Sequence, residues 1–221
     1  MIELVIFDCD GVIVDSEIIA NKSSAKLKTE LGYEISTEDH IRNFCGHGPS
    51  SPIVKEVWDQ LPDNYPELSS ARRDALMKEE LEPINNIAHA LDNLPLPFCM
   101  ASNSLSHKIA FMLELTDLHH YFDGRIFSAD MVKRGKPEPD VYLLAAETMG
   151  VAPEKCLVVE DSLPGVTAGV AAKMNVLGFT GGSHHPHMEI NDQLLELGAL
   201  ELFDDMTKLP QIIDGFLRKT A

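Results

Sequence analysis

The chain has 221 residues, with 35 acidic side chains against 18 Lys and Arg, so its formal net charge is −17. This acidic excess argues against nucleic acid and anionic membranes as partners, because both bind basic surfaces. With 44% hydrophobic and 24% charged residues, the composition is that of a globular protein and excludes extensive disorder. No apolar run reaches the roughly 18 residues of a membrane helix, and the N-terminus lacks the basic start of a signal peptide.

The four cysteines form no Cys-x-x-Cys pair, and most lie in or beside apolar runs. Buried free thiols explain this pattern better than disulfides or a zinc site. We therefore expect a cytoplasmic protein in a reducing compartment.

Apolar runs along the chain indicate strands that alternate with helices. The first run, residues 3–7, suits a central parallel strand that is buried on both faces. The other predicted strands are 98–101, 125–127, 157–159 and 176–179, and the predicted helices are 106–115, 140–149, 164–173 and 208–218. This alternation predicts an α/β fold with a doubly wound, Rossmann-like and mostly parallel sheet.

Residues 16–83 break the alternation, because they contain no convincing apolar strand and indicate helices punctuated by glycine and proline. We expect Ser16 to cap the first of these helices and Gly32 to end it. The chain therefore divides into a core, residues 1–15 and 84–221, and a small helical cap, residues 16–83, inserted after the first strand. An insertion at the carboxyl end of a strand lies over the edge where such sheets bind ligands, so it could act as a lid.

Acidic side chains follow two of the predicted strands. Asp8 and Asp10 come directly after the first strand, with Gly11 allowing a sharp turn, and Glu160 and Asp161 close a later strand. An Asp-x-Asp pair alone is as consistent with turn or cap residues as with a site. Two acidic strand ends in one parallel sheet would repel each other strongly, which favours a divalent cation between them, with Mg²⁺ the natural candidate.

Two polar segments lie at the ends of other elements. Ser102 and Asn103 follow the second predicted strand and precede a helix, where a hydroxyl and backbone N–H groups suit phosphate oxygens. Lys136 lies in a proline-rich loop ahead of another helix. Each segment alone is more often an ordinary cap or turn. Their order along the chain, together with the acidic pairs, indicates phosphate chemistry.

Four segments together resemble the motifs of the haloacid dehalogenase superfamily of phosphohydrolases. They are Asp8-Cys9-Asp10-Gly11-Val12, Ser102-Asn103, Lys136-Pro137 and Glu160-Asp161. In the position of its cap, the chain resembles the branch of this superfamily that contains β-phosphoglucomutase-like and sugar-phosphate phosphatase enzymes. The resemblance implies a Mg²⁺-dependent phosphatase that hydrolyses a small phosphomonoester, such as a sugar phosphate or sugar-acid phosphate, through an aspartyl-phosphate intermediate.

The resemblance also implies a role for each motif residue. Asp8 would be the nucleophile, and Asp10 the general acid and then the general base. The cation would be held by Asp8, the main-chain carbonyl of Asp10 and Asp161, with Glu160 binding it directly or through water. Among the remaining candidates, Ser102 and the N–H of Asn103 would hold phosphoryl oxygens, Lys136 would neutralise charge, and Gly46 and His47 of the cap would contact the leaving group.

Three assignments stay open at this stage. His47 could equally be an exposed loop histidine with no role. Asp15 could tether the cap or satisfy backbone N–H groups. For the cluster His184, His185 and His187 we expect a mobile loop near the site rather than a transition-metal site.

Two rival functions are weighed against the phosphatase. Mutases of the same family carry a histidine where this chain has Ala20 and an arginine where it has Pro49, and both departures favour release of phosphate to water. A non-enzymatic receiver-like phosphoacceptor module would share the acidic pair, metal, serine and lysine, but would have no use for Asp10 or the helical insertion. We expect a monomer that acts on a small phosphorylated metabolite.

Overall fold

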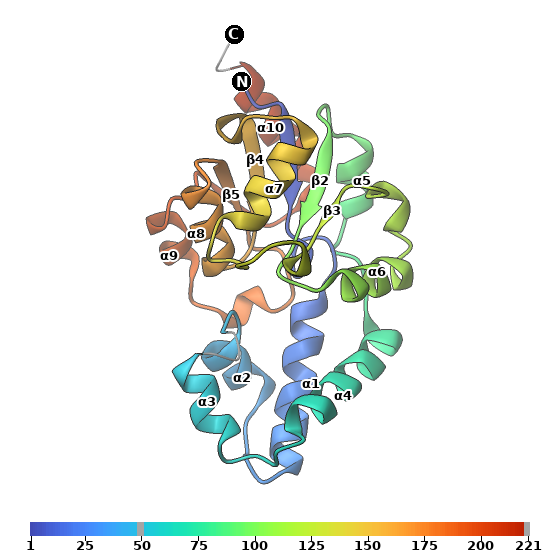
Figure 1. The fold of residues 1–221 in the computed structure, drawn as a ribbon, viewed down its shortest axis with the longest axis vertical. Helices are drawn as coiled ribbons and strands as arrows, with labels where there is room; N and C mark the ends of the chain where they lie inside the picture. Colours follow the sequence, from blue (N-terminus) through green and yellow to red (C-terminus); the bar gives the residue numbers. More distant parts are fainter. Residues whose placement is uncertain (48–50, 219–221) are drawn as a thin grey trace.

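The computed structural model describes residues 1–47 and 51–218 (Figure 1). None of the helices described there has the length and hydrophobicity needed to span a bilayer.

Within the described residues, six parallel strands form one sheet in the order β3-β2-β1-β4-β5-β6. The strands are β1 (Leu4–Phe7), β2 (Phe98–Ala101), β3 (Ile126–Phe127), β4 (Cys156–Glu160), β5 (Asn175–Phe179) and β6 (Leu202–Phe203). The predicted doubly wound parallel sheet is confirmed. The strand order reverses between β1 and β4, and ligands of such sheets bind beside the carboxyl ends of the strands at that point.

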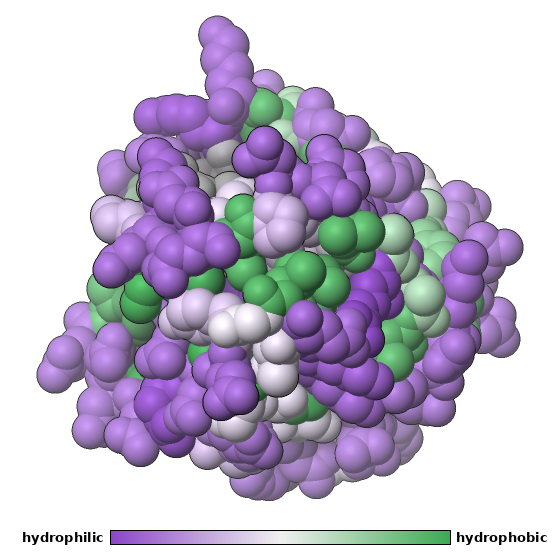
Figure 2. All heavy atoms as spheres, turned by 90° about the horizontal axis from the view of Figure 1, so that it is seen from below, coloured by the Kyte–Doolittle hydropathy of each residue, from purple (hydrophilic) through white to green (hydrophobic). Residues whose placement is uncertain are grey.

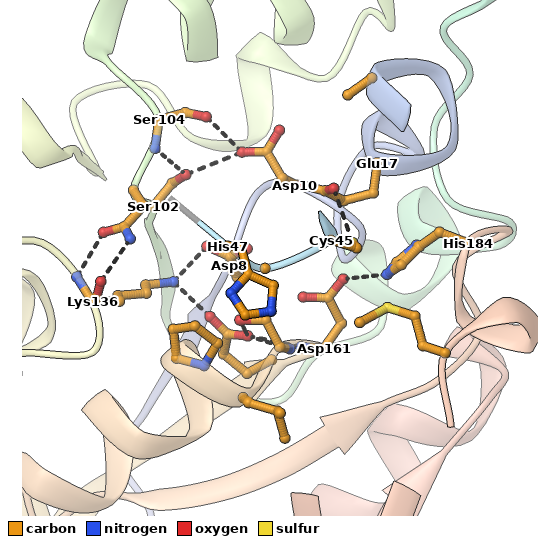
Figure 3. Close-up of a pocket in the computed structure, with 18 of the residues that line it drawn as sticks. Asp8, Asp10, Glu17, Cys45, His47, Ser102, Ser104, Lys136, Asp161 and His184 are labelled. Atoms are coloured by element: carbon orange, nitrogen blue, oxygen red, sulfur yellow. Dashed lines mark hydrogen bonds and ion pairs between the residues drawn. The ribbon is translucent and has the colours of Figure 1, made fainter. Parts of the chain in front are cut away.

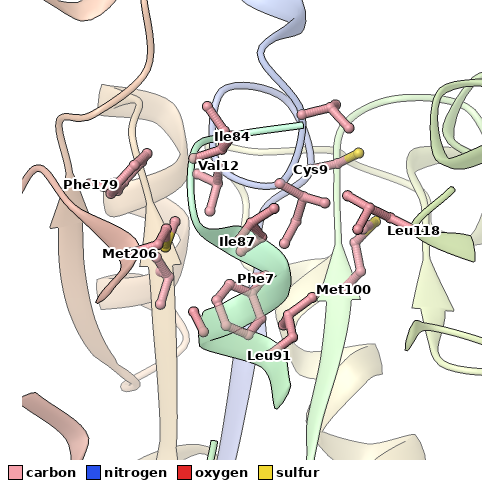
Figure 4. Packing of buried hydrophobic residues seen from close by; sticks show 14 of the residues in the cluster. Phe7, Cys9, Val12, Ile84, Ile87, Leu91, Met100, Leu118, Phe179 and Met206 are labelled. Atoms are coloured by element: carbon pink, nitrogen blue, oxygen red, sulfur yellow. The ribbon is translucent and has the colours of Figure 1, made fainter. Parts of the chain in front are cut away.

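Strand β1 is buried on both faces because its side chains alternate between two hydrophobic clusters. Val5 and Phe7 pack in one cluster, while Leu4 and Ile6 pack in the other. Figure 4 shows the first cluster around Phe7. It is covered by α5 (Ile87–Asp92), α6 (Ser106–Leu115) and α10 (Leu209–Arg218), and the second by α7 (Asp140–Met149), α8 (Leu163–Ala171) and α9 (Asn191–Glu196).

The segment 16–80, called the helical insertion below, contains four helices in its described parts, 16–47 and 51–80, and these lie below the sheet in Figure 1. They are α1 (Ser16–Glu30), α2 (Thr37–Phe44), α3 (Pro52–Trp58) and α4 (Tyr65–Glu80). Side chains from these helices and their connections, among them Leu27, Phe44 and Tyr65, form a separate hydrophobic cluster. Seen from below, this end of the molecule is mostly hydrophilic, with a few hydrophobic side chains near the centre (Figure 2).

The expectation that Ser16 caps α1 is wrong. The N-cap position is Asp15, whose side chain makes no capping hydrogen bond, and Ser16 is already within the helix. The Ser16 hydroxyl instead donates to Asp10 Oδ1 at 2.7 Å. The first turn of α1 therefore contributes to the site rather than to its own end. Gly32, with a φ of +96°, follows the end of the helix as expected.

Two backbone segments join the helical insertion to the sheet. The N–H of Asp15 donates to the carbonyl of Glu82, and the N–H of Ile84 donates to the carbonyl of Ile13, both at 3.0 Å. The chain thus leaves and returns through one antiparallel pairing, in which Val14 lies opposite Pro83.

Candidate active site

A cavity of about 860 Å³ lies between the carboxyl edge of the sheet and the helical insertion. Its size is typical of pockets for small molecules. All the side chains predicted for the site line it, and Figure 3 shows most of them converging there. They are Asp8, Asp10, Gly46, His47, Ser102, Asn103, Lys136, Glu160 and Asp161.

Lys136 lies at the centre of the buried charges. Its Nζ is 2.5 Å from Asp8 Oδ1 and 2.7 Å from Glu160 Oε1. Although burial opposes the charged form, the two carboxylates raise the pKa of Lys136 well above its ordinary value. The backbone of Lys136 is fixed by the side chain of Asn103, which accepts from its N–H at 2.7 Å and donates to its carbonyl at 3.0 Å. Asn103 therefore positions the lysine.

Glu160, fully buried at the end of β4, is surrounded by donors. Its Oε2 accepts from the N–H of Asp161 and from the N–H and hydroxyl of Ser162, each at 2.9 Å. Its Oε1 accepts from Lys136 and, at 3.1 Å, from the hydroxyl of Tyr142. Burial alone would raise the pKa of Glu160, but Lys136 and these hydrogen bonds outweigh it and lower the pKa.

Asp8, Glu160 and Asp161 form a buried acidic triad whose oxygens lie within 4.8 Å of one another. Burial, together with the neighbouring carboxylates, raises the pKa values of Asp8 and Asp161 well above the ordinary range, although the charge of Lys136 opposes this shift. One lysine cannot neutralise three carboxylates, and hard oxygen donors gathered at this spacing are the ligands that Mg²⁺ and Ca²⁺ take. The donor set of this structure therefore fits a divalent cation.

Asp10 lies in a different, half-buried environment made of hydroxyls. Its Oδ2 accepts from Ser104 at 2.7 Å and from Ser102 at 3.3 Å, while Oδ1 accepts from Ser16. The Ser102 hydroxyl also accepts from the N–H of Ser104 at 2.9 Å. Ser16 and Ser104 were not predicted as site residues, although Ser104 is adjacent in sequence to the predicted pair. Asp10 is thus held apart from the lysine that pairs with Asp8.

Two of the three clustered histidines, His184 and His185, are buried beside the site. His184 is 1% exposed, and its Nε2 lies 3.2 Å from Asp161 Oδ2. Its Nδ1 has no hydrogen-bond partner among the described residues. The same loop is anchored by Asp15, whose Oδ1 accepts from the N–H of Ser183 at 3.1 Å. Asp15 therefore accepts from a backbone N–H, one of the two roles left open for it, and local sequence did not indicate that this N–H lies in the loop after β5.

The helical insertion supplies the opposite wall of the cavity. Glu17 accepts a hydrogen bond from the Cys45 thiol at 3.4 Å, and burial raises the pKa of this glutamate. Gly46, with a φ of +78°, turns the chain toward His47, whose Nδ1 lies 3.1 Å from the Ser51 hydroxyl. His47 is exposed at the cavity mouth. Pro49, which entered the comparison with mutases, lies outside the described residues.

Comparisons with known proteins agree with this fold and site. Residues 5–179 match the haloacid dehalogenase-like hydrolase family. The chain is 30% identical to 6-phosphogluconate phosphatase of Escherichia coli (90% of this chain, 94% of the relative) and 32% identical to the phosphorylated carbohydrates phosphatase of Thermotoga maritima (90% and 93%).

Among solved structures, a haloacid dehalogenase-like protein of unknown function from Agrobacterium tumefaciens superposes with a TM-score of 0.90 and 37% identity, covering 98% of this chain and 100% of that one. The doubly wound parallel sheet, with acidic residues at the ends of its adjacent strands β1 and β4, places the chain in the class of α/β proteins that bind ligands at the carboxyl edge of the sheet. Within that class, the chain belongs to the haloacid dehalogenase-like hydrolase family.

Proposed function

We propose that the protein is a Mg²⁺-dependent phosphatase that hydrolyses a small phosphomonoester, a sugar phosphate or sugar-acid phosphate, through an aspartyl-phosphate intermediate. The observation that carries the proposal is the contrast between two carboxylates of one loop. Asp8 is buried against Lys136, whereas Asp10 is held by hydroxyls at the cavity wall. Named relatives that hydrolyse phosphorylated carbohydrates support the substrate class.

The first step forms the phosphoenzyme. The carboxylate of Asp8 attacks phosphorus, the bond from phosphorus to the ester oxygen breaks, and Asp10 donates its proton to the departing alkoxide. Lys136, the Ser102 hydroxyl and the N–H of Asn103 offset the charge on the phosphoryl oxygens. The products of this step are the free alcohol and the phosphorylated Asp8.

The second step regenerates the enzyme. Asp10, now ionised, takes a proton from a water molecule as that water attacks phosphorus. The bond between phosphorus and the Asp8 oxygen then breaks, so inorganic phosphate leaves and both side chains return to their starting states. One residue thus serves as acid and then as base, which requires Asp10 to stay free of an ion pair, as it is among the described residues.

The cation would be held by the carboxylates of Asp8 and Asp161 and the main-chain carbonyl of Asp10, with Glu160 binding it directly or through water. When bound, Mg²⁺ supplies positive charge that reduces the repulsion between the carboxylates and the phosphate ester.

Two features of the cavity favour a phosphatase over the rival functions. Ala20 lies on the cavity wall, and its methyl group offers no hydrogen bond to hold a sugar phosphate for transfer back. The cavity itself, with one wall formed by the helical insertion, suits a bound small molecule and has no purpose in a phosphoacceptor module. The free thiols of the four cysteines support a cytoplasmic location.

The test is phosphate release from p-nitrophenyl phosphate and a panel of phosphorylated metabolites, with Mg²⁺ present. We expect Asp8→Asn to abolish turnover and Asp10→Asn to retain a burst of phosphoenzyme, while the exposed control Asp63→Asn keeps wild-type rates. Equal residual activity in the two site variants would overturn the division of roles. Undiminished turnover after exhaustive chelation would show that the reaction needs no cation. A requirement for a bisphosphate activator, with no free phosphate produced, would establish the mutase.

A further inference from the structure

Two cations of the cavity have no part in the chemistry described above. Arg73 on α4 and Lys108 on α6 both line the cavity, one from the helical insertion and one from the helices of the sheet. Both reach the same neutral oxygen: Ser70 Oγ accepts from Arg73 Nη2 at 3.4 Å and from Lys108 Nζ at 3.3 Å. Two positive side chains therefore converge on one hydroxyl across the interface.

These two charges are poorly neutralised by the protein. Lys108 makes no ion pair with any residue that the structure describes. In the part of the chain that the structure describes, the ion-pair partner of Arg73 is Asp74, its neighbour in sequence. The distance between Arg73 Nε and Asp74 Oδ1 is 3.7 Å, and the Asp74 side chain is 44% exposed. Burial, and then the positive charge of Arg73, lower the pKa of Lys108. An anion bound between the two cations would relieve this repulsion.

The position of the pair identifies which part of a substrate it would meet. The charge of Lys108 interacts with Asp10, and that of Arg73 interacts with Glu17. Lys108 lies in the first turn of α6, just after Ser104, which donates to Asp10. Arg73 reaches the same Ser70 hydroxyl as Lys108, so both cations lie on the Asp10 side of the cavity, where the leaving group would be protonated. An anion bound there belongs to the alcohol portion of the ester.

We propose that Arg73 and Lys108 form a subsite for a carboxylate on the leaving group, so that the preferred substrate is a sugar-acid phosphate rather than a neutral sugar phosphate. This inference rests on the proposed phosphatase function. Asp74 offsets part of the charge of the two cations, which favours a singly charged carboxylate over the dianion of a second phosphate. A cavity of about 860 Å³ has room for a six-carbon chain between the two subsites.

The test compares two open-chain substrates that differ in one group. Gluconate 6-phosphate ends in a carboxylate and glucitol 6-phosphate in a hydroxymethyl group. We expect wild-type kcat/KM for the gluconate ester to exceed that for the glucitol ester by at least about tenfold, because charge-assisted hydrogen bonds distinguish them. Hexose 1,6-bisphosphate supplies a second phosphate in the carboxylate's place, and p-nitrophenyl phosphate supplies neither.

Variants assign the preference to the two cations. Lys108→Met and Arg73→Gln should each lower kcat/KM for the gluconate ester about 10- to 100-fold, mainly through KM, and leave the glucitol ester and p-nitrophenyl phosphate within about twofold. Arg72→Gln, which removes an arginine paired with Glu30, and exposed Lys55→Met are the matched controls and should change neither.

The outcomes separate the subsite from the activity on which it depends. Equal use of the gluconate and glucitol esters, or equal losses on both in the variants, overturns the carboxylate subsite. A bisphosphate preferred over the gluconate ester assigns the subsite to phosphate and also overturns the proposal. Absence of phosphate release from every ester, p-nitrophenyl phosphate included, refutes the phosphatase function itself.

Discussion

Glu160 gives the sharpest test of how the buried charges are held together. All of its described hydrogen-bond partners donate to it, including the ammonium of Lys136 and the hydroxyl of Tyr142. In Glu160→Gln, one carboxylate oxygen becomes an amide nitrogen, which has no lone pair to offer these donors. We expect this near-isosteric change to destabilise the protein substantially.

The size of the effect depends on where the new nitrogen points. At the Oε2 position it would face the N–H groups of Asp161 and Ser162, so the Oε1 position is favoured. There it faces Lys136, and the ion pair, with side chains 3% and 1% exposed, is lost. Breaking a buried pair costs about 3–5 kcal/mol, and we expect about 3 kcal/mol here because Lys136 keeps Asp8 as a partner.

Urea unfolding in the presence of a chelator measures this loss. The control is Glu3→Gln, the same substitution in an exposed ion pair with Lys155, which should cost less than about 1 kcal/mol. Because the pKa of Glu160 is lowered by folding, its contribution is present above the unfolded pKa of about 4.3 and is lost as pH falls through the folded value. A Glu160→Gln cost no larger than that of Glu3→Gln at pH 7 would refute this reasoning.

Three further predictions concern the helical insertion and the acidic triad. Lys28 is 3% exposed, and burial lowers its pKa to about 8, so below that pH its charge destabilises the fold. Lys28→Met removes this penalty and also the contacts of the ammonium with His40 and the Phe44 ring. Its free energy of unfolding relative to wild type should therefore be highest below pH 8 and fall by about 1–2 kcal/mol as pH rises toward about 10.4, the unfolded pKa of lysine. In Gly11→Ala the new Cβ would lie 1.9 Å from Asp161 Oδ2 at a φ of +76°, so calorimetric titration should show weaker Mg²⁺ binding. His184→Asn, which removes the ring beside Asp161, should weaken Mg²⁺ binding about 10- to 100-fold in the same titration.

Each of these predictions has a matched control. Exposed Lys26→Met should leave stability nearly unchanged at all pH values. Gly32→Ala introduces the same backbone strain at a φ of +96° with nothing within 4 Å, and should not affect Mg²⁺. His187→Asn is the control for His184→Asn, because it replaces a histidine of the same loop but leaves the contact between His184 and Asp161 intact. If Gly32→Ala or His187→Asn lost as much Mg²⁺ affinity as the corresponding site variant, the site variant would be acting through general instability.

Local sequence predicted the sheet and the motif residues because both signals are local. An apolar run followed by polar side chains marks a buried strand with a functional end, and helices 106–115 and 140–149 have the predicted bounds. Strand β6 is only two residues long, and it exists because Gly178 and Phe179 pair with it. No periodicity could reveal it.

The parts of the site that were missed depend on contacts distant in sequence. Asn103 fixes the backbone of Lys136, and His184 reaches Asp161 from the loop after the next strand. Serine is a common helix-capping residue, but the hydroxyl of Ser16 donates to Asp10 instead of capping α1. In each case residue type alone permits several partners, and the tertiary fold selects one.

The backbone pairing between Val14 and Pro83 determines how the helical insertion could be removed or replaced. Because the two connections lie side by side, the ends left by removing the helices between them are already close enough to be joined by a short turn. The sheet and its covering helices keep their own hydrophobic clusters on both faces. The insertion is therefore an exchangeable module: a different set of helices could be grafted onto the same two connections, altering which esters enter the cavity. Asp8, Glu160, Asp161 and Lys136 would stay in place, and the graft would need a donor in the position of Ser16 to hold Asp10.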